Sequence, residues 1–404
     1  MMLSIHGHVD PQPQLGQVDT GGQVAYVIEM SKHLAKLGLK VDVYTRWFEG
    51  KEKIESICPG ARIIRIPCGP SHFLRKEDLY PYLDEFAGNL IEFVRSENLD
   101  YDIVHSHYWD AGYVALKIKD VFKVIHVHTS HSLGAIKKER VRVSNAEQLY
   151  RFNIRLKVER DILEKAHVLA PASPLEPDII REYYGINRDA YVVPPGVDTD
   201  FFSPLTKYQK IEELPKRYIF STGRIEYTKG FDLLIRAFSH VRTKLFDVKL
   251  ILGGGSPKPT NLELRIRKEL SSLSSKLSVS DSVIQTGRIP NELLPTYYAK
   301  ASVVALPSRY DLFGIVALEA LACETPVVVS KYAGVSHYIT SDVGYICDPE
   351  NSVGFAEKMI KILYDDEKAR EMGKRGRKFV EENFSWEKLA QRLYALYKSS
   401  LPDV

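Results

Sequence analysis

Short apolar runs alternate with helix-like segments along this chain, and the whole pattern occurs twice. The segment Gln23–Leu37, between the first two runs, has apolar residues at helical spacing and stops at Gly38. Such alternation is typical of a mostly parallel β-sheet with helices on both faces. We therefore predict strands at residues 3–5, 41–44, 63–66, 103–105, 123–127, 168–171, 191–193, 218–222, 249–252, 283–285, 303–306, 327–329 and 344–346.

The two series of runs are separated by a linker. At 404 residues the chain is too long for one ordinary core. Pro194-Pro195-Gly196 opens a polar stretch that runs to Pro215, and the strand pattern restarts after it. We predict an α/β fold of two Rossmann-like domains, residues 1–198 and 199–385, facing each other across a cleft. The last segment, 386–404, contains a helical pattern and is expected to pack back on the first domain.

The composition excludes several classes of protein. The chain is 44% hydrophobic and 26% charged, as in globular proteins, and its formal net charge of +3 argues against a bulk nucleic-acid binder. The four cysteines are scattered, which is not the pattern of a disulfide framework or a zinc site. The first residues turn polar too soon for a signal peptide, and no run reaches 18 apolar residues. We expect a cytoplasmic protein without a membrane span; oligomeric state is not indicated.

An acidic motif follows the run at 303–306. Asp311 precedes Phe313 and Gly314, and Glu319 follows eight positions after Asp311, a little over two turns along a helix. Two carboxylates at this spacing cannot meet as an acid/base pair, but they can reach two hydroxyl-bearing parts of one long ligand. Gly314 permits close backbone approach, and the free N–H groups of a helix start suit a phosphate. This arrangement indicates a nucleotide sugar.

Glycine and basic motifs follow other strands. The sequence DTGGQ at 19–23 opens the first helix, and Gly223-Arg224 with Lys229-Gly230 follows the run at 218–222. Arginine and lysine together can hold a diphosphate. The alternatives are a plain flexible loop for the glycines and a solvated surface for the two cations. The glycines at 253–255 lack the lysine of a P-loop.

The histidines raise the question of a metal. The segment 105–131 contains five of them, but no acidic cluster joins them, so core histidines are favoured over a metal site. Alternation along the strand places His126 and His128 on one face. His131, in the loop HSLG at 131–134, is the better functional candidate, while the pair His6 and His8 simply follows the first strand. The DTD string at 198–200 is interpreted as part of the linker.

Together these motifs resemble the retaining glycosyltransferases of the GT-B fold, the family that includes sucrose-phosphate synthase, sucrose synthase and the mycothiol glycosyltransferase. The resemblance covers almost the whole chain, and the first-domain motifs look most like sucrose-phosphate synthase. The pieces that carry it are DTGGQ at 19–23, YTR at 44–46, IRIP at 64–67, KEDLYPY at 76–82, HSHY at 105–108, HSLG at 131–134, PPGVD at 194–198, GR at 223–224, KG at 229–230 and the acidic motif.

The resemblance implies a role for each matching residue. The catalytic group comprises His131 at the transferred sugar, Arg224 and Lys229 at the diphosphate, and Asp311 at the sugar hydroxyls. Donor binding further involves Gly22, Phe313, Gly314, Ile315 and Glu319, the last of these holding the ribose. The acceptor and its phosphate correspond to Gln23, Lys76, Tyr108, Ser132, Lys137 and Arg155. The resemblance implies no metal and no resident cofactor.

The chain departs from the family pattern in two places. Asp311 stands where the family has Glu, which shortens the side chain by roughly 1.5 Å. The family's Asn-Gly-Gly-Pro is replaced by the segment 332–335, Tyr-Ala-Gly-Val. Misplacement on this scale can cost roughly a hundredfold in rate. Either the Asp311 loop lies further inward, or the donor sugar differs, or the protein is a weak enzyme.

The resemblance implies transfer of a hexose, with retention, from a nucleoside-diphosphate sugar to a phosphorylated acceptor. UDP-glucose and fructose 6-phosphate are the expected pair. The alternatives are another donor or acceptor (UDP-N-acetylglucosamine with inositol phosphate, or GDP-mannose), or a weakly active or non-catalytic protein that binds sugar nucleotides. The loops at 19–23 and 131–134 argue against an epimerase of the same fold.

Overall fold

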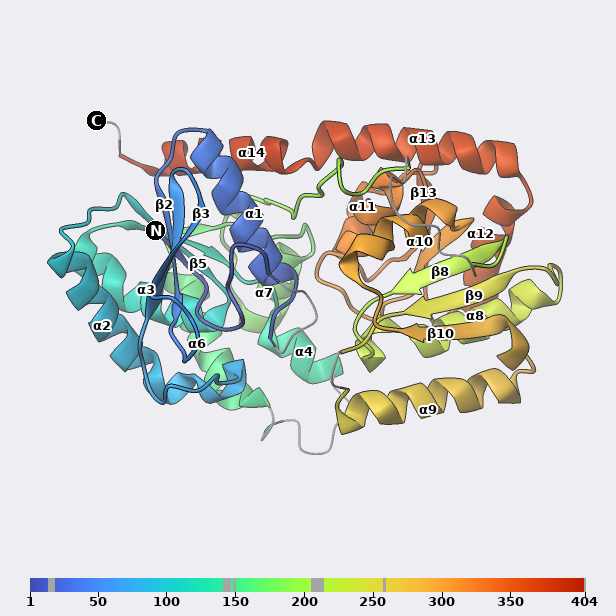
Figure 1. Cartoon of the computed structure of the whole chain (residues 1–404), viewed down its shortest axis with the longest axis horizontal. Helices are drawn as coiled ribbons and strands as arrows, with labels where there is room; N and C mark the ends of the chain where they lie inside the picture. The colour runs from blue at the N-terminus through green and yellow to red at the C-terminus, as the bar shows by residue number, and fades with distance from the viewer. Residues whose placement is uncertain (14–18, 141–146, 148–149, 205–213, 257–258, 403–404) are drawn as a thin grey trace. The chain divides into compact units, whose positions relative to one another are not determined.

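The computed structural model describes residues 1–13, 19–140, 147, 150–204, 214–256 and 259–402. Within it the chain forms two compact units (Figure 1). Unit 1 consists of Met1–Pro194 and Trp386–Val404, and unit 2 of Pro195–Ser385.

Unit 1 is built on a seven-stranded sheet in the order β3-β4-β2-β1-β5-β6-β7. Neighbouring strands are parallel except β3 and β4. The strands are β1 (Met2–Leu3), β2 (Val41–Arg46), β3 (Ile54–Cys58), β4 (Ala61–Ile66), β5 (Ile103–His107), β6 (Ile125–Thr129) and β7 (Val168–Leu169). The predicted run at 191–193 is not a strand, although the N–H groups of Tyr191 and Val193 donate to carbonyls of Leu169 and Pro171.

Helices cover both faces of this sheet. They are α1 (Gly22–Lys36), α2 (Leu83–Ser96), α3 (Trp109–Phe122), α4 (Gly134–Arg140), α6 (Phe152–Lys165), α7 (Glu176–Tyr184) and α14 (Trp386–Ser400). One core packs the sheet against α2, α3 and α6, and the other packs it against α1 and α14. The predicted end of α1 is confirmed, because Gly38 has φ +92° and its N–H donates to the carbonyl of Ala35.

Unit 2 contains a six-stranded, wholly parallel sheet in the order β10-β9-β8-β11-β12-β13. The strands are β8 (Tyr218–Thr222), β9 (Lys249–Gly253), β10 (Val283–Gly287), β11 (Val303–Leu306), β12 (Val327–Ser330) and β13 (Gly344–Cys347). The predicted α/β class with two parallel sheets is thus confirmed.

The helices of unit 2 also form two layers. One core packs the sheet against α8 (Phe231–Arg242), α9 (Asn261–Lys276) and α12 (Ser352–Leu363). The other packs it against α10 (Leu294–Lys300), α11 (Ile315–Ala322) and α13 (Asp366–Asn383). None of the described helices combines the length and the apolar character that crossing a membrane requires.

Candidate active site

The acidic motif of unit 2 forms a loop between β11 and α11. Gly314 caps α11 with φ +93°, and a Cβ there would lie 2.7 Å from Leu306 Cδ2, so the position requires glycine. The Asp311 N–H donates to the carbonyl of Tyr332 over 3.2 Å, and the Asp311 carbonyl accepts from Gly334 over 3.1 Å. The segment that replaces the family's Asn-Gly-Gly-Pro therefore holds the Asp311 loop directly.

The structure brings this loop together with the basic motif. Lys229 lies in a short 3₁₀ turn (Tyr227–Lys229), and its Nζ is 2.5 Å from Asp311 Oδ2. Both side chains are largely shielded, 18% and 16% exposed. The next residue, Gly230, has φ +68°, and a Cβ there would lie 2.1 Å from the Pro307 carbonyl oxygen. The turn and the loop are consequently packed backbone to backbone.

Arg224 lies at the edge of this group. Its side chain is 72% exposed and pairs with Glu226 over 2.8 Å. A Cβ on Gly223 would lie 3.7 Å from the Lys229 side chain, so the backbone beside Arg224 packs against Lys229. The two cations of the motif are therefore close along the backbone but differ in their exposure to solvent.

Glu319 lies in the second turn of α11, where its Oε2 accepts a hydrogen bond from the Tyr298 hydroxyl over 2.6 Å. Burial raises the pKa of Glu319 to about 7, and the Tyr298 hydrogen bond opposes that rise. The sequence did not single out Tyr298, because a tyrosine in the apolar segment of α10 resembles an ordinary core residue. Phe313 is buried in the core, its carbonyl accepts from Val335 over 2.6 Å, and Ile315 begins α11.

In unit 1, Lys76 is paired with Asp19. Its Nζ contacts Asp19 Oδ1, and its backbone N–H donates to Asp19 Oδ2 over 2.9 Å. Burial would lower the pKa of Lys76, but the charges of Asp19 and Glu77 outweigh it and raise the pKa. Lys76 is therefore a firmly charged ammonium ion beside the start of α1.

Three predicted acceptor residues converge nearby. The Arg155 guanidinium carbon lies 4.8 Å from the centre of the Tyr108 ring. Its Nη2 donates to the carbonyl of Ser132 over 2.8 Å and to Ser132 Oγ over 3.3 Å. Its Nε donates to Glu159 over 2.7 Å, and Glu159 also accepts from the Gly134 N–H. Arg155 is only 2% exposed, so these contacts hold its side chain in a fixed position beside Tyr108 and Ser132.

The other predicted residues of unit 1 are more dispersed. Gln23, next to Gly22 at the start of α1, donates through Nε2 to Ser4 Oγ and to the His107 carbonyl, each over 3.2 Å. Lys137 Nζ lies 4.2 Å from the Tyr150 ring centre, and its N–H donates to the Leu133 carbonyl over 3.2 Å.

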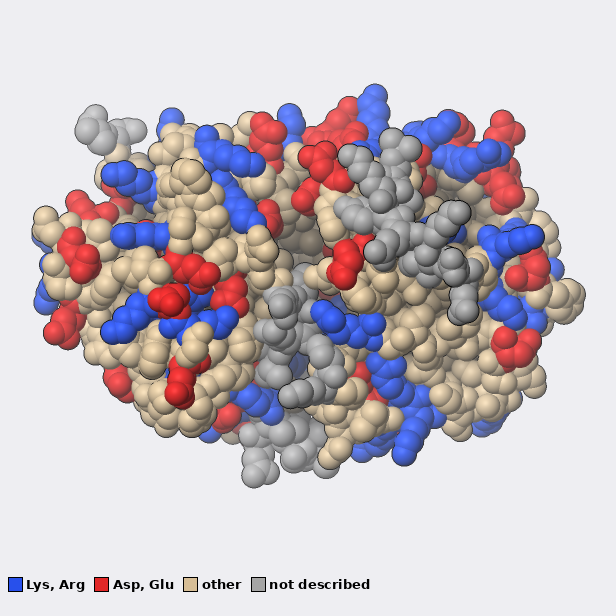
Figure 2. All heavy atoms as spheres, in the orientation of Figure 1, with Lys and Arg blue, Asp and Glu red and all other residues tan. Residues whose placement is uncertain are grey.

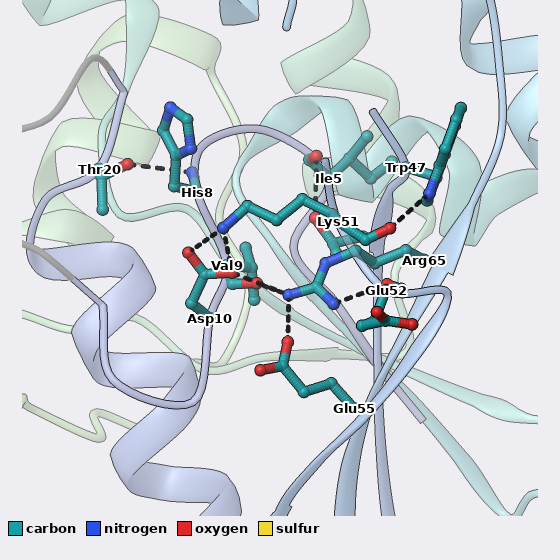
Figure 3. A network of polar contacts seen from close by, with 11 residues as sticks. Ile5, His8, Val9, Asp10, Thr20, Trp47, Lys51, Glu52, Glu55 and Arg65 are labelled. Atoms are coloured by element: carbon teal, nitrogen blue, oxygen red, sulfur yellow. Dashed lines mark hydrogen bonds and ion pairs between the residues drawn. The ribbon is translucent and has the colours of Figure 1, made fainter. Parts of the chain in front are cut away.

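A buried network holds the loop after β1 (Figure 3). Arg65 Nη2 donates to the Val9 carbonyl, to Asp10 and to Glu55, each over 2.8 Å. Lys51 adds a second cation to Asp10, with Nζ 2.7 Å from Oδ2. The sequence placed Arg65 in a family-like motif without a role; the structure shows that it fixes the loop that precedes α1.

Comparison with known proteins agrees with this arrangement. Residues 206–379 match the model described as "Glycosyl transferases group 1", and residues 20–201 match "Glycosyltransferase Family 4". The chain is 32% identical to mannosylfructose-phosphate synthase of Agrobacterium fabrum, over 98% of this chain and 90% of that protein. It belongs to the group 1 glycosyl transferases.

Further relatives extend the comparison. The D-inositol 3-phosphate glycosyltransferase of Corynebacterium diphtheriae is 30% identical over 98% of this chain and 93% of that protein. The solved structure of sucrose-phosphate synthase from Thermosynechococcus elongatus superposes with a TM-score of 0.85 at 30% identity, covering 98% of each chain. The predicted family, the retaining GT-B glycosyltransferases, is confirmed.

Four of the five histidines between residues 105 and 131 of this glycosyltransferase are interior groups. His126 Nε2 and His128 Nδ1 lie 2.7 and 2.8 Å from Ser106 Oγ, which confirms that they share one face. His131, at φ +53°, has its Nε2 2.9 Å from His107 Nδ1, and burial lowers its pKa to about 3. His131 is therefore neutral at physiological pH and can present a hydrogen-bonding ring but not a charge.

The DTD string at 198–200, interpreted from the sequence as part of the linker, forms a turn. Asp198 Oδ1 accepts the N–H groups of Asp200 and Phe201 over 3.0 and 2.9 Å, so this aspartate closes a turn.

Figure 2 shows Lys and Arg interspersed with Asp and Glu over the described part of the face that it draws. This mixture fits the small net charge of the chain.

Proposed function

We propose that this chain transfers a hexose from a nucleoside-diphosphate sugar to a phosphorylated acceptor with retention of configuration. The observation that carries the proposal is the group Tyr108, Ser132 and Arg155 in unit 1, with the charged Lys76 in the same unit. Cations and hydroxyls from four separate segments would be redundant for a neutral sugar. A phosphate, with three acceptor oxygens and a negative charge, uses them all.

The residues proposed to bind the donor lie in unit 2, except Gly22, which lies in unit 1. Lys229 and Arg224 would neutralise the diphosphate, the start of α11 would offer N–H groups to it, and Glu319 would accept from the ribose hydroxyls. Asp311 would hold sugar hydroxyls, and its ion pair with Lys229 argues against a role as the nucleophile that attacks the anomeric carbon. The acceptor hydroxyl forms the new bond, the bond to the diphosphate breaks, and the leaving phosphate takes the proton.

For the substrates, we propose fructose 6-phosphate as acceptor and UDP-glucose as donor. The names mannosylfructose-phosphate synthase and sucrose-phosphate synthase support a phosphorylated fructose product. The first name equally supports a mannose donor, and the name D-inositol 3-phosphate glycosyltransferase supports an inositol phosphate acceptor. A panel of UDP-glucose, UDP-N-acetylglucosamine and GDP-mannose against fructose 6-phosphate and inositol phosphate decides among these pairs.

The acceptor phosphate is tested by removing it. A charge-assisted hydrogen bond contributes roughly 1.5–3 kcal/mol, so kcat/KM should be at least tenfold higher for fructose 6-phosphate than for fructose. Lys76→Ala should remove most of that preference while donor hydrolysis stays intact. Lys165→Ala, which removes an exposed lysine paired with Asp161, is the matched control and should change neither.

The contrary outcome is clear. Equal efficiency with fructose and fructose 6-phosphate, or with inositol and its phosphate, would refute the phosphate pocket. The chain would then act on neutral sugars, as the sucrose synthase alternative implies.

A further inference from the structure

The histidine that follows β1 forms a buried pair that the proposed reaction leaves unexplained. His6 Nδ1 lies 2.7 Å from Asp110 Oδ2, and the two side chains are 6% and 0% exposed. Asp110 lies in the first turn of α3, where its Oδ1 also accepts the N–H of Ala111 over 2.6 Å. The two hydrogen bonds, one to each carboxylate oxygen, hold the Asp110 side chain in place at the start of α3.

This contact determines which nitrogen of the His6 ring carries a proton. A carboxylate can only accept hydrogen bonds, so Nδ1 of His6 must carry the proton that it shares with Asp110. In the neutral ring the other nitrogen, Nε2, is then an acceptor. In its neutral form His6 therefore presents one lone pair, at Nε2, on the side of the ring away from Asp110.

The neighbours of His6 are the residues proposed for the acceptor and the transferred sugar. Its ring meets the Tyr108 ring edge-on, with centres 4.8 Å apart, and Tyr108 is the ring on which Arg155 stacks. Burial lowers the pKa of His131, and His128 and His6 lower it further. Burial alone would raise the pKa of Asp19, but Lys76, with a smaller contribution from His6, lowers it. The charged form of His6 thus acts on both Asp19 and His131, so the His6 ring lies near both side chains.

We propose that His6, oriented by Asp110, is a further acceptor-binding residue whose Nε2 accepts a hydrogen bond from a hydroxyl of the acceptor. The inference rests on the proposed function and deepens it, since it names a contact to the sugar portion beside the phosphate site. A polyhydroxylated acceptor supplies the required O–H donor. A ligand with a carboxylate or carbonyl at that point would meet a lone pair and bind poorly.

The competing explanation is hydration. His6 also lines a small open hollow with Gly7, Arg46, Phe73 and Leu79, of about 10 Å³, which suffices for a single water molecule. If Nε2 bonds only such a water, His6 has a structural role, and its replacement changes stability but not the use of the acceptor.

Three substitutions separate these explanations. His6→Asn keeps an amide N–H for Asp110 but lacks Nε2, whereas His6→Gln places an amide near the Nε2 position. Asp110→Asn can donate to Nδ1 and so reverse the tautomer, which turns Nε2 into a donor. His33→Asn is the matched control, because His33 bonds the Glu29 carbonyl at the far end of α1.

The measurement is the KM of each variant for acceptor and for donor, together with the rate of donor hydrolysis. We expect His6→Asn and Asp110→Asn each to raise the acceptor KM about tenfold with donor hydrolysis unchanged, and His6→Gln to recover part of the loss. The double variant should be no worse than either single one, since both remove one contact. An acceptor lacking the contacted hydroxyl should be used equally by the wild type and His6→Asn.

Two results overturn the inference. An unchanged acceptor KM in His6→Asn would assign Nε2 to water, and an equal fall in acceptor use and donor hydrolysis would assign the pair to folding. If the wild type uses only free sugars, the proposed phosphate acceptor is wrong. The His6 contact is then judged by the same variants on the free sugar, because a hydroxyl contact does not need the phosphate.

Discussion

Each unit of this glycosyltransferase holds a lysine proposed to meet a phosphate, and each lysine is paired with an aspartate. In unit 1, Lys76 pairs with Asp19, whose second oxygen accepts the backbone N–H of the same lysine. In unit 2, Lys229 pairs with Asp311, a residue itself proposed to bind sugar hydroxyls. In the first pair the aspartate bonds the same lysine twice, whereas the second pair consists of two residues that are both proposed to bind the donor.

The arginines show the same difference. Arg155 is 2% exposed and fixed by Glu159 and Ser132, whereas Arg224 has a side chain that is 72% exposed beside Glu226. The arginine proposed for the acceptor is therefore buried and bonded within the protein before any ligand binds. The arginine proposed for the donor diphosphate is largely exposed to solvent.

The largest expected effect is on the donor side. Lys229→Ala and Arg224→Ala should each lower turnover at least about a hundredfold, because each removes charge stabilisation of the leaving group. Steady-state kcat with saturating donor measures this, and Lys268→Ala, on the exposed side of α9, serves as the control. Near-normal turnover in both variants would make these cations ordinary surface charges.

A smaller effect should separate the two aspartates. Asp311→Asn is expected to lower kcat about tenfold, since it weakens both the sugar contact and the placement of Lys229. Asp19→Asn should leave kcat within about threefold but increase the preference for a phosphorylated acceptor, because Lys76 loses its competing counterion. Kinetics with fructose 6-phosphate and fructose measure both; equal losses of kcat would show that the pairs do not differ.

The smallest expected effect is a pH dependence of donor binding. The pKa of Glu319 is raised to about 7, so its carboxylate, the better acceptor for ribose hydroxyls, forms as pH rises. The donor KM should fall by about threefold to tenfold between pH 6 and 8, and Glu319→Gln should abolish the slope. A slope that persists in the variant would assign the titration to another group.

The same ionisation has an opposite effect on the ligand-free chain. The folded protein holds the Glu319 proton more tightly than the unfolded chain, whose pKa is near 4.5. The free energy of unfolding should therefore decrease as pH rises from about 4.5 to about 7. Thermal melting of the wild type and Glu319→Gln over this range measures the difference.

The sequence predicted the central strands of the sheets more accurately than the strands at their edges. Runs of Val, Ile and Leu predicted the bounds of β8 and β11 correctly, since strands buried on both faces are continuously apolar. It missed β3, whose sequence IESIC has two adjacent polar residues and which lies antiparallel at the edge of the sheet. It also predicted a strand at 191–193. There the N–H groups of Tyr191 and Val193 bond to carbonyls of the β7 segment, but the residues do not form a strand.

For the site, the motifs identified the ligand-binding residues proposed here but not their partners. The Lys229–Asp311 pair joins two motifs 82 positions apart, and Lys76–Asp19 spans 57. Glu159 and Tyr298 belong to no motif, and each resembles an ordinary helical residue. Such partners depend on which loops the sheet brings together. Because the partners are distant in the sequence, no local pattern in a single sequence reveals them.

The last described helix also has a consequence for how the protein is made. Helix α14 buries Trp386 and Leu393 in the second core of unit 1, and Tyr397 lies 2.6 Å from His105 Nδ1. Residues 386–400 leave the ribosome only after all of unit 2 has been synthesised. Unit 2 can thus complete its fold first, while α1 waits with an uncovered apolar face that chaperones can recognise until the chain returns.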